Sequence, residues 1–391
     1  MADQLFAAQS RIKIAMVAGE ASGDLLGSHL IRALKARFPD AEFVGIGGPK
    51  MQGVGLKSVF PMETLAVNGY VEVLKNLRAI LRIRRDLTDQ LLADRPHVFI
   101  GIDAPDFNLG LERTLKAKGV TTIHYVSPSI WAWRGERIKK IKACVSHMLA
   151  LFPMEPPLYQ QAGIPVTYVG HPLADEMPLV PDLAAMREQL DIPLACRVIA
   201  LLPGSRQSEV AALAETYINT AKLLSEQVPN VLFLVPLVSR ETRALFEATL
   251  YRLQAQALPL RIMFGHAHDA LIAADVALVA SGTATLETAL LKRPMVITYK
   301  VSPLTYRLMW HRKYLPYIGL PNVLAGDFVV PEILQDDATP ANLAQALTNM
   351  LDHNRVVDGL QAKFMDIHLT LRQGTAERAA EAIAAYLPHA H

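Results

Sequence analysis

An aspartate lies where an apolar segment of the chain ends. Residues 98–101, Val-Phe-Ile-Gly, have the pattern of a buried strand, Ile102 continues it, and Asp103 follows directly. Pro105 has no backbone N–H, so regular strand pairing must stop near it. A carboxylate at the carboxyl end of a buried strand can be desolvated, and its pKa then rises enough to accept a proton from a hydroxyl group. Asp103 is therefore a candidate general base; the alternative is a cap for the turn or helix that follows.

Two later segments have the composition of anion-binding loops. Pro-Gly-Ser-Arg at 203–206 and Ser-Gly-Thr at 281–283 each follow an apolar run and precede a helical pattern. Backbone N–H groups and the helix dipole favour phosphate there, and an arginine can clamp two oxygens. Neither segment has P-loop spacing. Together they predict a nucleotide diphosphate site, with Glu287 either gripping ribose hydroxyls or acting as an ordinary first-turn acid. The candidate residues are Gly204, Ser205, Arg206, Ser281, Gly282, Thr283 and Glu287.

Two loops in the first half of the chain are candidates to line the site of the same reaction. Gly-Glu-Ala-Ser-Gly-Asp at 19–24 lies between an apolar strand pattern and a helix, without dinucleotide-fold spacing. It allows close approach of a ligand, or it is a tight turn capped by Ser22 or Asp24. Tryptophans in the loop after the apolar run at 120–126 either wall a pocket or pack as a corner. The candidate residues are Glu20, Ser22, Gly23, Asp24, Trp131 and Trp133.

Short apolar runs alternate with helical patterns along the chain, which predicts α/β structure with largely parallel sheets. The alternation breaks between about 174 and 195, where three prolines occur, and restarts at 198–202. We therefore expect one domain over 1–175, a second over 196–350 and C-terminal helices over 351–391. A chain of 391 residues has the length for two ordinary domains.

Composition limits the class of protein. A net charge of +2 argues against a nucleic-acid binder that works by neutralising phosphates. No run of 18 apolar residues and no convincing signal peptide occur, and two cysteines, Cys144 and Cys196, fit a reducing cytoplasm better than a disulfide framework. His266 and His268 have no accompanying ligand set, so we expect no metal site.

A helical pattern over 67–87 carries an apolar and a basic face. Such a helix either lies on an anionic membrane surface or packs on its sheet with a solvated basic side. A second mixture of bulky apolar and basic residues, at 306–315, also suits a membrane interface. The candidate membrane-facing residues are Tyr70, Val73, Leu74, Leu77, Arg78 and Leu81.

Taken together, the motifs resemble those of the lipid-A-disaccharide synthase family. The segments that carry the resemblance lie at 17–24, 101–108, 124–133, 202–206, 280–287 and 320–326. They occur in order over nearly the whole chain, and the Asp103 motif together with Trp-Ala-Trp is the most specific part. The resemblance implies a GT-B fold, with two Rossmann-like domains facing across a cleft and a C-terminal helix returning to the N-terminal domain.

The resemblance also implies the chemistry: a metal-independent inverting enzyme without a cofactor. It would join UDP-2,3-diacylglucosamine to 2,3-diacylglucosamine 1-phosphate (lipid X), giving lipid A disaccharide 1-phosphate and UDP. The catalytic base falls on Asp103, and UDP-binding residues fall on Arg206 and Asn322. Ala21 and the pair at 207–208 depart from the family pattern without removing a needed group. The family works at the cytoplasmic face of the inner membrane, and some members are homodimers through exchanged C-terminal parts.

Two other readings stay open at this point. One is a related GT-B enzyme that uses UDP-N-acetylglucosamine, either a transferase to an undecaprenyl lipid or an epimerase. The other is a catalytically inactive nucleotide-sugar-binding protein at the membrane, which the intact candidate base and phosphate loops do not favour.

Overall fold

A computed structural model describes residues 11–65, 70–132, 135–301 and 314–388; the side chains of 70–76 and 354–356 are outside this description. The chain forms two compact units. The first comprises Met1–Asp175 together with Leu371–His391, and the second comprises Glu176–Thr370. Each unit is an α/β structure built on its own sheet.

The first unit is built on seven parallel strands in the order β3-β2-β1-β4-β5-β6-β7. Successive residues of β1 alternate between two cores: Ile14 and Met16 pack on one face, and Ala15 and Val17 on the other. The strand therefore reads as one continuous apolar run. The strands are β1 (Lys13–Ala18), β2 (Glu42–Ile46), β3 (Leu56–Ser58), β4 (Val98–Ile102), β5 (Thr121–Tyr125), β6 (His147–Ala150) and β7 (Val166–Tyr168).

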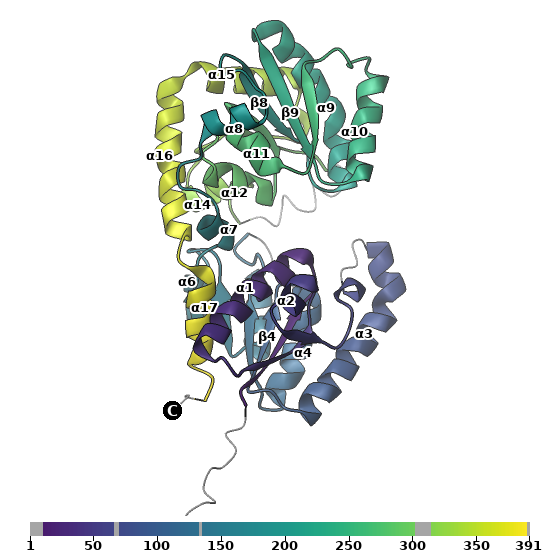
Figure 1. Cartoon of the computed structure of the whole chain (residues 1–391), viewed down its shortest axis with the longest axis vertical. Coiled ribbons are helices and arrows are strands. Elements are labelled where there is room, and N and C mark those ends of the chain that lie inside the picture. The colour runs from purple at the N-terminus through teal and green to yellow at the C-terminus, as the bar shows by residue number, and fades with distance from the viewer. Residues whose placement is uncertain (1–10, 66–69, 133–134, 302–313, 389–391) are drawn as a thin grey trace, which may run out of the picture. The chain divides into compact units, whose positions relative to one another are not determined.

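Helices cover both faces of this sheet. On one face α1 lies beside the last helix of the chain, α17, whose Ala379, Ala380 and Ile383 are fully buried (Figure 1). The C-terminal helix thus returns to the first unit, as predicted. The helices are α1 (Ala21–Arg37), α2 (Pro49–Gly53), α3 (Tyr70–Ala93), α4 (Pro105–Ala117), α5 (Ile138–Cys144), α6 (Pro156–Gln161), α7 (Pro172–Glu176) and α17 (Thr375–Ala384), with 3₁₀ turns at Met62–Thr64 and Gly135–Arg137.

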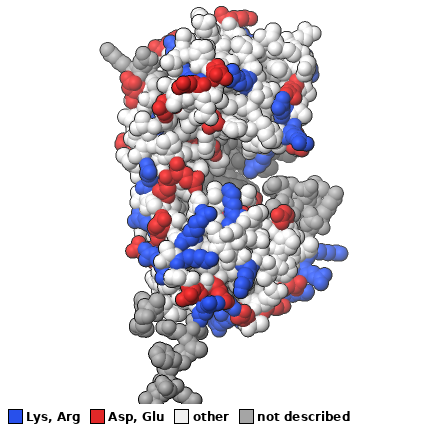
Figure 2. Space-filling view, viewed as in Figure 1, with Lys and Arg blue, Asp and Glu red and all other residues white. Residues whose placement is uncertain are grey.

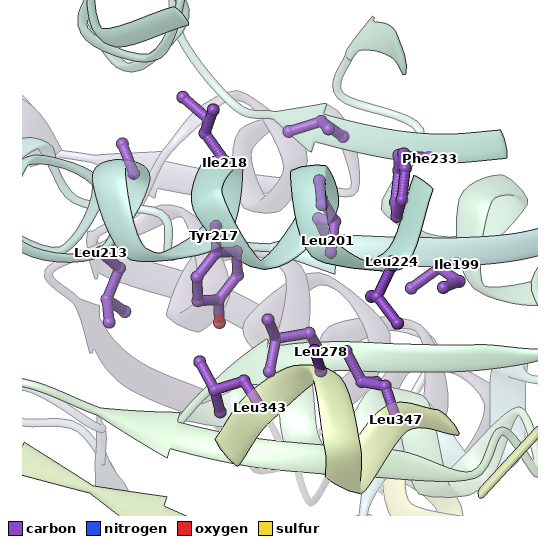
Figure 3. Close-up of a cluster of buried hydrophobic side chains, with 14 of the residues drawn as sticks. Ile199, Leu201, Leu213, Tyr217, Ile218, Leu224, Phe233, Leu278, Leu343 and Leu347 are labelled. Carbon is purple, nitrogen blue, oxygen red and sulfur yellow. The ribbon is translucent and has the colours of Figure 1, made fainter. Parts of the chain in front are cut away.

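The second unit has six parallel strands in the order β10-β9-β8-β11-β12-β13. Its main core lies where α9 and α15 cover β8, β9 and β11, with Tyr217 and Phe233 fully buried among aliphatic side chains (Figure 3). The strands are β8 (Arg197–Leu202), β9 (Val231–Leu237), β10 (Leu260–Phe264), β11 (Val276–Ala280), β12 (Met295–Tyr299) and β13 (Glu332–Leu334). The helices are α8 (Leu183–Gln189), α9 (Gln207–Gln227), α10 (Arg240–Arg252), α11 (Ala267–Ala273), α12 (Thr283–Leu290), α14 (Leu320–Ala325), α15 (Pro340–Asp352) and α16 (Asn354–Leu371), with a 3₁₀ turn at Gln335–Asp337.

The predicted α/β structure with two parallel sheets is confirmed. The edge strands β3 and β13 were not predicted, because each has three residues and no apolar run. Basic and acidic side chains both occur over the face in Figure 2. Within the described ranges, every helix is too short or too polar to cross a membrane.

Candidate functional site

The candidate base, Asp103, occupies a strained turn between β4 and α4. Asp103 and the next residue, Ala104, both have left-handed backbone conformations, with φ of +50° and +42°. Such conformations cost roughly 1–3 kcal/mol each for residues other than glycine, and they persist only where the surroundings enforce them. The Asp103 N–H donates to the carbonyl of Tyr125, 2.8 Å away, and so ties the turn to the end of β5. The side chain of Asp103 is half-buried.

Asn108, one turn into α4, enforces this geometry. Its side chain is fully buried, and its amide Nδ2 lies 2.8 Å from the carbonyl oxygen of Asp103 and 3.3 Å from those of Ile102 and Val17. One amide thus joins the ends of β1 and β4 to the helix. At Gly101 an added Cβ would lie 2.2 Å from Glu112 Oε1, so this position requires glycine.

A buried acid–histidine pair lies beneath the turn. Glu112 Oε1 and His124 Nδ1 are 2.7 Å apart, and both side chains are fully inaccessible to solvent. Burial raises the pKa of Glu112, and the charge and hydrogen bond of His124 oppose that rise. Glu112 Oε2 and His124 Nε2 have no hydrogen-bond partner among the described residues. The sequence did not identify this pair, because its members are twelve residues apart on different elements.

The loop at 19–24 follows β1, the neighbour of β4, and an added Cβ at Gly19 would lie 3.0 Å from Ala104 Cβ. Glu20 and Ser22 are exposed, whereas Gly23 is buried. Asp24 is also buried, and its carboxylate accepts the N–H groups of the first turn of α2, at 3.0 Å each. Asp24 therefore stabilises the start of α2, whereas the sequence suggested it as a possible cap for the turn at 19–24 that precedes α1.

Trp131 follows β5 and is half-buried, with its ring 6.3 Å from that of Phe152 in an edge-to-face arrangement. Trp133 lies outside the described residues. Because β1, β4 and β5 are adjacent and parallel, their carboxyl ends bring Asp103, the 19–24 loop and Trp131 to one edge of the first sheet.

In the second unit, both predicted anion loops follow adjacent strands, β8 and β11. Gly204 has φ of +120°, and after it the N–H groups of Ser205 and Arg206 donate to Glu209 Oε2, at 3.0 and 3.2 Å. The guanidinium of Arg206 is 79% exposed and lies 3.2 Å from Glu209 Oε1. A carboxylate thus occupies N–H groups of the kind that bind phosphate.

The second of these loops is open. Gly282 has φ of +156° and nothing within 4 Å of an added Cβ, and Thr283 is exposed at the start of α12. The Ser281 N–H donates to the Thr298 carbonyl. Glu287 Oε2 pairs with His268 Nε2 at 3.0 Å, and this hydrogen bond raises the pKa of His268.

Asn322, predicted from the resemblance to bind UDP, is fully buried in the second unit. Its Nδ2 donates to the Val330 carbonyl and to Glu332 Oε1, and its Oδ1 accepts the N–H groups of Val329 and Val330, all at 2.8–2.9 Å. The amide is saturated by its own unit, so its observed role is to shape the segment around α14.

On α3, the side chains of Leu77 and Leu81 are 40% and 42% exposed, and Arg78 is exposed beside them. The side chains of Tyr70, Val73 and Leu74 lie outside the described residues, as does most of the segment at 306–315.

Comparison with known proteins gives one consistent result. The family model for lipid-A-disaccharide synthetase matches residues 14–386. The lipid-A-disaccharide synthase of Dechloromonas aromatica is 61% identical over 375 residues, covering 96% of this chain and 98% of that protein. The enzyme of that name from Chromobacterium violaceum is 58% identical, covering 97% and 98%.

Solved structures match in fold. UDP-GlcNAc 2-epimerase of Methanocaldococcus jannaschii, in complex with UDP-GlcNAc and UDP, aligns with a TM-score of 0.59 at 14% identity, covering 96% of this chain and all of that one. The calicheamicin glycosyltransferase CalG4 aligns with a TM-score of 0.59 at 12% identity, covering 96% and 98%. At this identity the likeness establishes the GT-B fold alone.

Proposed function

Because the chain belongs to the lipid-A-disaccharide synthase family, a family of lipid A biosynthesis glycosyltransferases, we propose that it joins UDP-2,3-diacylglucosamine to lipid X. The products are lipid A disaccharide 1-phosphate and UDP. The observation that carries the proposal is the near-full-length identity to proteins of this name, 61% over 375 residues in one case.

In the proposed reaction, the 6-hydroxyl oxygen of lipid X attacks the anomeric carbon of the donor with inversion. The new C–O bond forms as the bond from the anomeric carbon to the diphosphate breaks, and the hydroxyl proton passes to the Asp103 carboxylate. The fixed, half-buried position of Asp103 at a sheet edge supports this role.

The diphosphate of the donor would bind at the loops that follow β8 and β11. Arg206 is exposed and carries a full positive charge, and the Ser281–Thr283 loop presents open backbone at the start of α12. Such groups stabilise the negative charge that develops on UDP as it leaves. Glu287, held by His268, is our candidate for the ribose hydroxyls.

Mass spectrometry of the product tests this proposal. Purified protein would be incubated with UDP-2,3-diacylglucosamine and lipid X in detergent micelles, with Asp103→Ala in parallel. A tetraacyl disaccharide phosphate from the wild type and none from the variant is the expected result. Bound UDP without that product would overturn the substrate assignment, and conversion of UDP-N-acetylglucosamine to its 2-epimer would establish the epimerase alternative.

We further propose that α3 contacts the cytoplasmic face of the inner membrane. Its exposed Leu77 and Leu81 lie four residues apart, on the same side of the helix, and Arg78, Arg82 and Arg85 are exposed beside them. Apolar insertion combined with attraction to anionic lipid binds such helices. The double variant Leu77→Ser/Leu81→Ser should no longer sediment with anionic vesicles. Leu369→Ser, at a leucine of the second unit that is 52% exposed, is the control. Equal sedimentation of all three proteins would contradict the proposal.

A homodimer through exchanged C-terminal parts stays a prediction, and a mass of two chains in light scattering would establish a dimer.

A further inference from the structure

The first unit contains a buried acid, Glu155, that the reaction described above does not use. It lies at the start of α6, after β6, and its side chain is 1% exposed. The N–H of Phe152 donates to its Oε2 at 3.0 Å. The backbone of Leu151 and the side chains of Ser127 and Trp131 are further polar groups near the carboxyl that lower its pKa.

Two of these groups belong to the loop after β5. Ser127 is itself buried, and its Oγ lies 2.6 Å from the hydroxyl of Tyr159 on α6. Trp131 packs edge-to-face on Phe152, whose ring lies 5.4 Å from that of His171. A single carboxylate therefore holds the Phe152 backbone, and with it the ring on which the Trp131 indole packs.

The loop that Glu155 holds begins at a strained residue. Val126 has φ of +82°, a conformation that is a genuine outlier for a β-branched side chain. Strain of this kind persists only where neighbouring contacts enforce it. The residue before it, Tyr125, accepts the backbone N–H of Asp103. The strained turn at Val126 is therefore linked by one peptide unit and one hydrogen bond to the strained turn of the catalytic aspartate.

The described residues around Glu155 supply polar groups that lower its pKa: the backbone of Phe152 and Leu151 and the side chains of Ser127 and Trp131. Desolvation outweighs them and raises the pKa to about 8. Tyr159 and Tyr168 also face the carboxyl, and burial raises their own pKa values. An acid buried in this way is costly for stability, which favours a functional reason for its presence.

We propose that Glu155 is a positioning residue for the transfer reaction, holding Trp131 and the Val126 turn so that Asp103 and the acceptor sugar meet in the reactive geometry. The part that concerns the reaction rests on the proposed function, whereas the part that concerns Trp131 does not.

The structural part is tested in protein labelled with 5-fluorotryptophan. The chain has three tryptophans, and Trp131→Phe assigns the fluorine resonance of Trp131. Glu155→Gln places an amide donor against N–H donors, so the Trp131 resonance should shift or broaden. Glu136→Gln, an exposed acid just beyond the same loop, is the matched control and should leave it unchanged. An unchanged Trp131 resonance in Glu155→Gln would overturn the proposal.

The catalytic part is tested by kinetics on the same proteins. We expect Glu155→Gln to lower kcat/KM for the acceptor by about 10- to 100-fold, because a displacement of reacting groups by about 1 Å can have an effect of this size. The affinity for UDP should not change, because the predicted UDP loops lie in the second unit. A shifted resonance with wild-type turnover would overturn the role in the reaction. If the wild type makes no disaccharide, the proposed function fails, and the resonance still decides whether Glu155 holds Trp131.

Two further measurements cover a failure of Glu155→Gln to fold. Ser127→Ala removes one hydrogen bond and should move the Trp131 resonance in the same direction with a smaller loss of turnover. In the wild type, the raised pKa means that the folded state holds a proton that the unfolded state releases between pH 4.5 and about 8. Stability from this group is thus full at low pH and is lost as pH rises through that window, and the Trp131 resonance should titrate near its upper end. A flat titration together with an unaltered resonance in Ser127→Ala would overturn the proposal.

Discussion

The turns that carry the candidate site use different residue types in the two units. After β4 and β5 in the first unit, the left-handed positions are held by Asp103, Ala104 and Val126, none of which is glycine. After β8 and β11 in the second unit, Gly204 and Gly282 supply the corresponding turns. Glycine adopts these conformations with little strain, whereas the other residues need enforcement from their surroundings.

In the first unit, buried polar groups hold these strained turns in place. The first edge is backed by Asn108, the Glu112–His124 pair and Glu155, all inaccessible or nearly so. The second edge presents Ser205, Arg206 and Thr283 to solvent. In the proposed reaction, the first edge (the fixed edge) holds the Asp103 side chain in place for the reacting hydroxyl. The second edge (the open edge) exposes the Arg206 guanidinium and the start of α12 for the diphosphate.

The largest effect should come from Asp103, the proposed base on the fixed edge. Asp103→Asn keeps the size of the side chain, and asparagine tolerates the left-handed conformation, so the fold should be retained. We expect kcat to fall about 10²–10⁴-fold, the usual contribution of a general base. UDP affinity, measured by calorimetry, should stay at the wild-type value.

Asp106→Asn provides the control, since that carboxylate is 94% exposed and only 3.8 Å from Arg137 in a loose pair. Turnover by Asp103→Asn equal to that of the control would remove Asp103 as the base and with it the reason for the strained turn.

The difference between the two edges explains which parts of the candidate site could be predicted from the sequence. The two glycine loops and the acid at the end of β4 are local patterns, so they were identified, as were the parallel sheets. The supports of the fixed edge are not local: Glu112 and His124 are 12 residues apart, and Glu155 lies 24 residues after Trp131. An isolated Glu in a helical pattern looks like a solvated residue until the fold buries it. The assignment of Asn322 to UDP binding came from the resemblance and stays a prediction; the sequence did not show that its amide is saturated inside its own unit.

The next largest effect should come from the amide that enforces the aspartate turn. Asn108→Ala leaves the carbonyls of Val17, Ile102 and Asp103 without their donor. A buried group that loses its partner costs about 1–3 kcal/mol of stability. Because the turn would relax toward unstrained conformations, we expect kcat to fall roughly 10- to 100-fold as well, by displacement of the carboxylate. Urea unfolding and steady-state kinetics measure the two effects separately.

Thr114→Ala, which removes an exposed hydroxyl bond on the same helix, should change neither quantity by much. If the kcat of Asn108→Ala, corrected for the folded fraction, equals that of the wild type, the turn does not need enforcement and the contrast between the two edges loses its catalytic meaning.

On the open edge, replacement of Arg206 should weaken UDP binding and leave the first unit unchanged. Arg206→Ala deletes a charge-assisted hydrogen-bond donor worth about 1.5–3 kcal/mol, so UDP should bind roughly 10- to 100-fold more weakly. The effect should diminish as salt is added, since the guanidinium is exposed. Arg240→Ala, at the start of α10 in the same unit, is a control of equal charge. UDP affinity equal in both variants would exclude Arg206 from the diphosphate site.

The smallest effect concerns Glu209, the carboxylate that accepts backbone N–H groups of the loop at 203–206. Glu209 accepts the N–H groups of Ser205 and Arg206 and pairs with the Arg206 guanidinium, so a phosphate using those donors must displace it. An exposed pair of this kind is worth about 0.2–1 kcal/mol, and its removal in Glu209→Ala should tighten UDP binding by roughly 1.5- to 5-fold. The helix should lose some stability, because Glu209 also completes the capping box of α9.

Glu215→Ala on the same helix removes an exposed pair with Arg252 and should leave UDP affinity unchanged. Weaker binding in Glu209→Ala alone would mean that this carboxylate shapes the loop for its ligand instead of competing with it. The second edge would then also depend on an internal support, and the difference between the two units would be one of exposure only.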